Sequence, residues 1–89
     1  MYEGKLRILR IISQPYVLEL LNAMIKPKRF KELVGVCNNE RTLTLKLKVF
    51  QKNGLIDVFP VREGNRYFNS YKITNRGIKV LKMIKELKV

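Results

Sequence analysis

The sequence predicts a single α+β domain that is mainly helical and carries a small β sheet of two to three strands. Two observations predict this fold class. Apolar residues recur at helical spacing through most of the 89-residue chain, but over residues 55–73 they alternate as in β strands. Glycines and prolines stand singly where one pattern gives way to the next, so residues 1–89 are expected to form one domain without linkers.

The first two expected helices differ in how far their apolar side chains extend around the helix. Over residues 5–12 these side chains cover more than half of the helix circumference, so the segment needs cover on several sides. The next helix is expected to start after Ser13 or Gln14, either of which can act as N-cap with Pro15 in the first turn. Its core-facing residues are Val17, Leu18, Leu21, Met24 and Ile25.

Two further helices follow a break at Pro27. A short helix is expected over residues 29–34, ended by Gly35. A longer one is expected over about residues 39–53, with Asn38 or Asn39 as N-cap and a left-handed glycine as its stop. The core positions of this longer helix are Leu43, Leu47 and Phe50.

The opposite face of the helix over residues 39–53 is expected to point into water. At 100° per residue, the positions opposite the core recur at spacing i, i+4, i+7 and i+11. These positions are occupied by Arg41, Leu45, Lys48 and Lys52, with Thr44 beside them. The stripe is therefore basic and contains one exposed leucine.

Residues 55–61 and 66–73 are predicted to be two strands joined by a tight turn at Gly64 and Asn65. This register places Val58 opposite Tyr71 and Ile56 opposite Ile73 on the core side. Because a proline cannot donate to a neighbouring strand, Pro60 requires the first strand to lie at the edge of the sheet.

A last helix is expected over residues 75–89, capped by Thr74. This helix and the N-terminal helix, residues 1–12, carry more apolar surface than a small domain can cover, which predicts a two-fold homodimer built from both. The expected interface residues are Leu6, Leu9, Ile12, Val80, Leu81, Ile84 and Leu87.

The composition limits the chemistry available to the chain. There are 19 Lys and Arg residues against 7 Asp and Glu, a net charge of +12, which favours an anionic partner. With no histidine, one cysteine (Cys37) and one aspartate (Asp57), one chain cannot assemble a Ser-His-Asp triad, a Cys-His pair or a Cys/His zinc site. We therefore expect no enzymatic activity, no catalytic residue, no metal and no cofactor, and we interpret Cys37 as a packing residue. No apolar run approaches the roughly 18 residues of a membrane span, so a cytoplasmic protein is expected.

Four stretches of the chain carry a family resemblance. Residues 29–33, 41–48, 53–56 and 71–77 together resemble the HxlR type of winged helix-turn-helix regulator, with MarR and ArsR proteins as more distant relatives. The resemblance covers the chain from Pro15 to the C-terminus. It implies a dimeric transcription regulator whose helix over residues 39–53 lies in the major groove while the hairpin, or wing, reaches the minor groove or the backbone. No cysteine lies near the N-terminus, where redox-sensing members carry theirs, so a thiol-sensing role is not expected.

The residues themselves also favour double-stranded DNA as the partner. An outward helix with arginine and leucine fits the major groove of B-DNA, where arginine bonds guanine edges and leucine contacts thymine methyl groups. Basic residues at the wing tip would be attracted by a narrow minor groove. The predicted DNA-binding residues are Arg29, Lys31, Asn39, Arg41, Thr42, Thr44, Leu45, Lys48, Lys52, Arg62 and Arg66.

Two alternatives remain open at this stage. The charge of +12 also fits a sequence-tolerant architectural or nucleoid protein, whose affinity comes mainly from phosphate neutralisation. A protein-interaction module would instead use apolar residues of the wing, namely Phe59, Val61 and Phe68. The charge pattern and the family likeness suit small archaeal or viral regulators.

Overall fold

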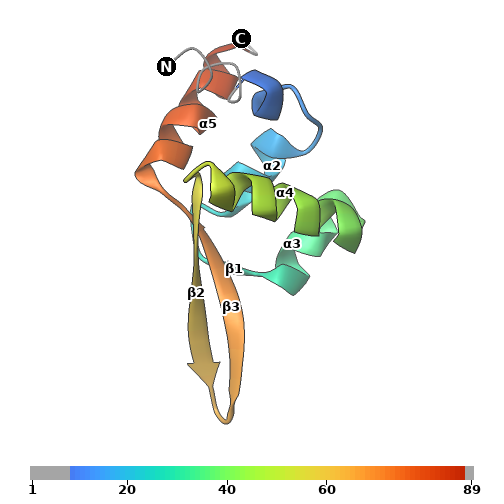
Figure 1. Cartoon of the computed structure of the whole chain (residues 1–89), viewed down its shortest axis with the longest axis vertical. Coiled ribbons are helices and arrows are strands. Elements are labelled where there is room, and N and C mark those ends of the chain that lie inside the picture. The colour runs from blue at the N-terminus through green and yellow to red at the C-terminus, as the bar shows by residue number, and fades with distance from the viewer. Residues whose placement is uncertain (1–8, 88–89) are drawn as a thin grey trace.

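The structure is a computed structural model that describes residues 9–87. Residues 9–12 are helical and lead into the first complete helix. The elements then follow in the order α2 (Val17–Ala23), β1 (Lys28–Arg29), α3 (Phe30–Cys37), α4 (Glu40–Lys52), β2 (Ile56–Glu63), β3 (Arg66–Ile73) and α5 (Asn75–Leu87), as Figure 1 shows. This arrangement confirms the predicted α+β class with a winged helix-turn-helix.

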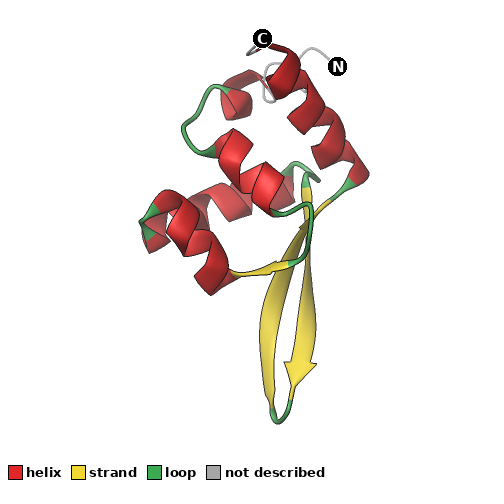
Figure 2. Ribbon diagram, turned by 180° about the vertical axis from the view of Figure 1, so that it is seen from behind, coloured by secondary structure: helices red, strands yellow, loops and turns green. Residues whose placement is uncertain are grey.

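The helices gather at one end of the molecule and the hairpin of β2 and β3 extends away from them (Figures 1 and 2). The molecule is accordingly elongated, with extents of 45 × 26 × 22 Å. Two backbone hydrogen bonds fix the base of the hairpin: the Ile73 N–H donates to the carbonyl of Met24 at 2.8 Å, and the Thr74 N–H donates to that of Leu55 at 2.9 Å. The wing thus starts from a fixed point on the helical body.

The three strands form an antiparallel sheet in the order β1-β3-β2. The predicted register is confirmed, since Ile56 pairs with Ile73 and Val58 with Tyr71. β2 lies at the edge of this sheet, as Pro60 requires, because the proline has no N–H to donate to a further strand on that side. The two-residue strand β1 was not predicted from the sequence, since it depends on a pairing with the distant β3.

The core lies between the helices and the base of the hairpin. The largest fully buried side chains come from three helices and the segments beside them, and they are Phe50, Leu20, Leu21, Met24, Leu33, Leu43, Leu55 and Val17. Burial of each side chain of this size stabilises a fold by about 1.5–3 kcal/mol. The predicted core positions of α4 are confirmed, because Leu43, Leu47 and Phe50 are all buried.

The predicted start of α2 is wrong. Its N-cap is Tyr16, which has a left-handed backbone (φ 67°) and makes no side-chain capping bond. The Ser13 hydroxyl instead donates to the carbonyl of Arg10, and the Gln14 side chain bonds to α4. Ile25 also differs from the prediction: α2 ends before it, and its side chain is 47% exposed.

The predicted end of α3 is also wrong. The helix runs through Gly35 to Cys37, and it is Asn38, with φ 56°, that takes the left-handed position after it. The reason is packing: Leu33 and Cys37 lie one turn apart on the buried face, so extending the helix buries the cysteine side chain. The predicted role of Cys37 in packing is confirmed, although it lies in a helix.

The cap of α5 agrees with the prediction, but its apolar face does not serve as predicted. The Gly77 N–H donates to the Thr74 hydroxyl at 3.0 Å, and that hydroxyl donates to the carbonyl of Gly54 at 2.6 Å. However, three expected interface residues are only 2–3% exposed and belong to the core of the chain itself: Val80, Leu81 and Ile84. A partner could reach only the residues of α5 that stay exposed. Leu6, another expected interface residue, lies outside the described residues.

Candidate nucleic-acid interface

Helix α4 presents its basic stripe to solvent, as predicted. All five residues of the stripe are exposed: Arg41, Thr44, Leu45, Lys48 and Lys52. Leu45 is 56% exposed, although removing leucine surface from water is favourable. The opposite side of α4 packs into the core, and this packing holds the helix in place while the stripe remains in water.

Two further rows of side chains flank the stripe. One row faces residues 10–14, and a hollow of about 230 Å³ on that side is lined by Gln14, Thr42, Leu45, Lys46 and Val49. The other row faces the wing, where a hollow of about 320 Å³ is lined by Phe30, Thr44, Leu47, Lys48, Gln51, Val58, Asn69 and Tyr71. The stripe is therefore a ridge between two depressions.

Two predicted DNA-binding residues have structural bonds within α4. The Asn39 side-chain oxygen accepts a hydrogen bond from the Thr42 N–H at 2.9 Å, so Asn39 is the N-cap. The Thr44 hydroxyl donates to the carbonyl of Glu40 at 2.8 Å. Thr42 itself is half-buried and lies on the row that faces residues 10–14.

The wing tip carries two exposed arginines. The Arg62 Nε donates to the carbonyl of Gly64 at 3.0 Å, and its guanidinium lies 5.9 Å from the ring centroid of Tyr67. This contact orients one of the two tip charges. Arg66, at the start of β3, is exposed and lies on the other face of the hairpin from Tyr67.

Arg29 is already engaged inside the chain. Its guanidinium lies 3.7 Å from the ring centroid of Phe68 and forms an ion pair with Glu63. These contacts join the start of α3 to the wing. Arg29 nevertheless remains exposed, as does Lys31 two residues further on. The apolar wing residues of the protein-interaction alternative are Phe59, Val61 and Phe68; each is half-buried, and the arginine lies over the last of them.

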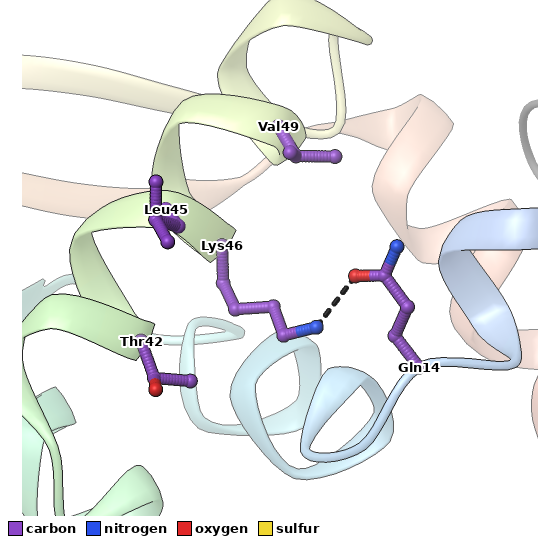
Figure 3. A pocket seen from close by; sticks show the side chains of 5 residues that line it. All are labelled: Gln14, Thr42, Leu45, Lys46 and Val49. Carbon is purple, nitrogen blue, oxygen red and sulfur yellow. Dashed lines mark hydrogen bonds between the residues drawn. The ribbon is translucent and has the colours of Figure 1, made fainter.

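Sequence reasoning missed the contact between Lys46 and Gln14. Lys46 Nζ donates to Gln14 Oε1 at 2.5 Å and so bridges α4 to the segment before α2 (Figure 3). Burial lowers the pKa of the Lys46 ammonium, and the neighbouring Cys37 offsets part of that effect. The sequence indicated only that residue 46 lies between the stripe and the core on the helix surface. It could not indicate the contact itself, because Gln14 lies 32 residues away.

The described residues offer neither a metal-ion cluster nor a membrane-spanning helix. Within residues 9–87 no group of three or more His, Cys, Asp or Glu side chains could hold a metal ion. None of the helices in that same range has the length and apolar character to cross a membrane.

Comparison with known proteins identifies the family. The model of the HxlR-like helix-turn-helix family matches residues 11–89. The chain belongs to the HxlR-like family. Its members are transcription regulators built on a DNA-binding winged helix-turn-helix. A search of curated proteins found no match to this HxlR-like chain.

Solved structures share the fold of this HxlR-like protein. A protein assigned to the MarR family of transcriptional regulators, from Enterococcus faecalis V583, has a TM-score of 0.77 at 24% identity, over 90% of this chain and 74% of that one. The reduced form of the transcriptional regulator YodB from B. subtilis has a TM-score of 0.78 at 18% identity, over 90% and 80%. A transcriptional regulator homologue from Pyrococcus horikoshii OT3 has a TM-score of 0.75 at 20% identity, over 94% and 88%.

Proposed function

We propose that this HxlR-like protein is a sequence-specific regulator that binds double-stranded DNA as a homodimer. In this proposal α4 lies in the major groove and residues 62–66 of the wing contact the minor groove or the backbone. The observation that carries the proposal is the exposed stripe on α4, which is basic, contains a leucine and is not covered by any other described part of the chain.

The stripe divides into base-reading and phosphate-binding positions. Arg41 lies in the first turn of α4, where an arginine in the major groove can bond the O6 and N7 of guanine. Leu45, one turn on, can cover a thymine methyl group, which gives its exposed surface an apolar contact. Lys48 and Lys52 lie further along the helix and are suited to phosphates, as is Lys31 on α3.

The remaining predicted contacts support this arrangement in different ways. Arg62 and Arg66 bring positive charge to the wing tip, where a narrow minor groove would attract it. Asn39, Thr42 and Thr44 shape the start and the flanks of α4. Arg29 holds the wing against α3 through Glu63 and Phe68, and we assign it this positioning role.

A two-fold dimer is supported by the apolar surface that remains at the helical end. Leu9 is 51% exposed, Met83 44% and Leu87 71%. A hollow of about 290 Å³ lies between residues 9–13 and the end of α5, and it is lined by Leu9, Ile12, Ser13, Ile84 and Leu87. In such a dimer we expect the two recognition helices to lie about 34 Å apart, because helix-turn-helix dimers bind half-sites one turn of DNA apart. The expected binding site is therefore pseudo-palindromic.

The direct test is selection of bound fragments from a random duplex pool, followed by affinity measurements on the recovered site. Arg41→Ala should cost about 1–3 kcal/mol and relax the preference at one base position. Lys48→Ala should weaken binding to all duplexes alike. It should also reduce the slope of the logarithm of the binding constant against the logarithm of salt concentration by about 0.9, because one phosphate is no longer neutralised. Lys79→Ala, which removes an exposed lysine of α5, is the matched control and should change neither the base preference nor the slope measurably.

The net charge favours one competing function, the sequence-tolerant architectural protein. Under that alternative the selected fragments would share no common sequence, and Arg41→Ala would lower the affinity for every duplex equally. Either result would overturn the proposal of sequence-specific binding.

A further inference from the structure

We propose that the hollow between residues 10–14 and α4 binds a small organic anion with an aliphatic body, of the alkyl carboxylate class, and that this anion competes with DNA. Only the competition rests on the proposed function.

The anion would meet the ammonium group of Lys46. Lys46 is half-buried, and among residues 9–87 no carboxylate oxygen lies within 4 Å of its Nζ. Burial lowers the pKa of Lys46, as expected for a desolvated cation. The neighbouring Cys37 offsets only part of this lowering, and its thiol does not serve as a counter-charge at pH 7, because burial raises the pKa of Cys37 above 9.0.

Hydrogen-bond donors remain available at the ammonium group. A lysine ammonium has three N–H donors, and the described structure gives one partner to Lys46, the Gln14 Oε1. Figure 3 shows the lysine side chain extended across the hollow toward Gln14, with Thr42 and Leu45 on the same side of α4. A carboxylate placed beside Nζ would therefore gain charge-assisted bonds without displacing the glutamine.

The rest of the lining is suited to an aliphatic chain. Leu45 and Val49 supply apolar surface next to Lys46. A second hollow, of about 300 Å³, shares Val49 with the first and continues past Ile11 to Arg10, Lys52 and Asn53. The two depressions are thus neighbours that meet at Val49, and each is lined by apolar side chains together with at least one cationic side chain. We call the pair the groove. Inorganic phosphate would satisfy only the cations, whereas an alkyl carboxylate also covers the apolar side chains.

Competition with DNA follows from shared residues. Leu45 and Lys52 line the groove and also belong to the stripe that we place in the major groove. An anion seated over them would obstruct the entry of α4 and neutralise part of its charge. By linkage, DNA must then weaken binding of the anion by the same factor.

The site is tested by calorimetric titration of the full chain, without DNA, with hexanoate. Hexanamide, which has the same body without the charge, and inorganic phosphate, which has the charge without the body, are the comparison probes. We expect hexanoate to bind with one site per chain and each comparison probe to bind at least about tenfold more weakly. Hexanamide lacks the negative charge that strengthens the bonds to Nζ, and phosphate lacks the aliphatic chain whose burial contributes to binding.

Variants locate the site. Lys46→Met keeps the length of the side chain and should weaken hexanoate binding by at least about tenfold. Leu45→Ala, at an exposed position where folding is not at risk, should weaken hexanoate several-fold and leave the weak binding of acetate unchanged. Lys72→Met, at an exposed lysine of β3, is the matched control and should bind hexanoate as the unmodified chain does.

The outcomes separate this proposal from the proposed function. Absence of hexanoate binding at millimolar concentration, equal binding of hexanamide, or unchanged binding by Lys46→Met would each overturn the site. Phosphate binding as strong as that of hexanoate would show a phosphate site instead and would also overturn it. If hexanoate binds and the protein binds no DNA duplex, the site stands and the proposed function fails. If hexanoate and DNA both bind and neither weakens the binding of the other, the competition is refuted.

Discussion

Gly77 shows how a single residue sets the distance between α5 and the hairpin. A β-carbon built at this position would clash with the carbonyl oxygen of Leu55 and lie 2.5 Å from Cγ1 of Ile73. Both of these neighbours belong to the packed base of the hairpin, so neither can move freely. Gly35, by contrast, lies within α3 with nothing within 4 Å of such a β-carbon.

The same substitution should therefore have opposite effects at these two glycines. Gly77→Ala should lower the free energy of unfolding by about 1–3 kcal/mol or more, because overpacking forces the backbone to shift. Gly35→Ala should raise it by about 0.5–1 kcal/mol, because alanine loses less entropy than glycine in a helix. Urea unfolding of the two variants measures both, and effects of the same sign would contradict the close approach of α5 to the hairpin.

The buried cysteine leads to a second prediction at this scale. Cys37 is 4% exposed, and burial raises the pKa of its thiol above 9.0, with Lys46 opposing the shift. A raised pKa means a smaller thiolate fraction at pH 8, and the thiolate is the reactive form. We expect Cys37 to react with a disulfide reagent such as DTNB far more slowly in the folded chain than in guanidinium. Equal rates in both conditions would indicate an accessible, sensor-like thiol.

At the scale of elements, the start of the recognition helix depends on one cap. Asn39→Ala should lower the free energy of unfolding by about 1 kcal/mol, because the Thr42 N–H loses its acceptor. Asn39→Ser keeps an acceptor at the cap and should cost less. If Asn39 serves only as a cap, the serine variant will retain both stability and DNA affinity in urea unfolding and binding assays. Retained stability with reduced affinity would instead show that Asn39 bonds DNA directly.

The elements also show where sequence reasoning was sufficient and where it was not. The phases of α4 and the register of β2 and β3 were predicted correctly, because local periodicity and the turn at Gly64 and Asn65 determine them. The start of α2 and the end of α3 were predicted wrongly, because several residues could serve as caps. The choice among them depends on packing elsewhere, as the buried Cys37 at the end of α3 illustrates.

The whole molecule leaves apolar surface at its helical end, and this leads to a prediction on assembly. The chain should sediment as a dimer at micromolar concentration. Leu87→Glu, which puts a charge at the most exposed leucine of α5, should shift it to a monomer. Leu45→Ala should remain a dimer, since Leu45 belongs to the DNA-facing stripe. A monomeric unmodified chain would remove the two-fold arrangement and the pseudo-palindromic site with it.

For this chain, composition and periodicity were enough to predict a basic winged helix with a solvent-facing stripe on α4, because charge, helical phase and strand alternation are properties of neighbouring residues. Folding of the whole chain decided three other features: that the apolar face of α5 is covered by the chain's own core, how Arg29 reaches Glu63, and that Lys46 lies against Gln14. Each joins residues that are far apart in sequence. Such contacts depend on how the elements pack together, and no local pattern encodes that packing.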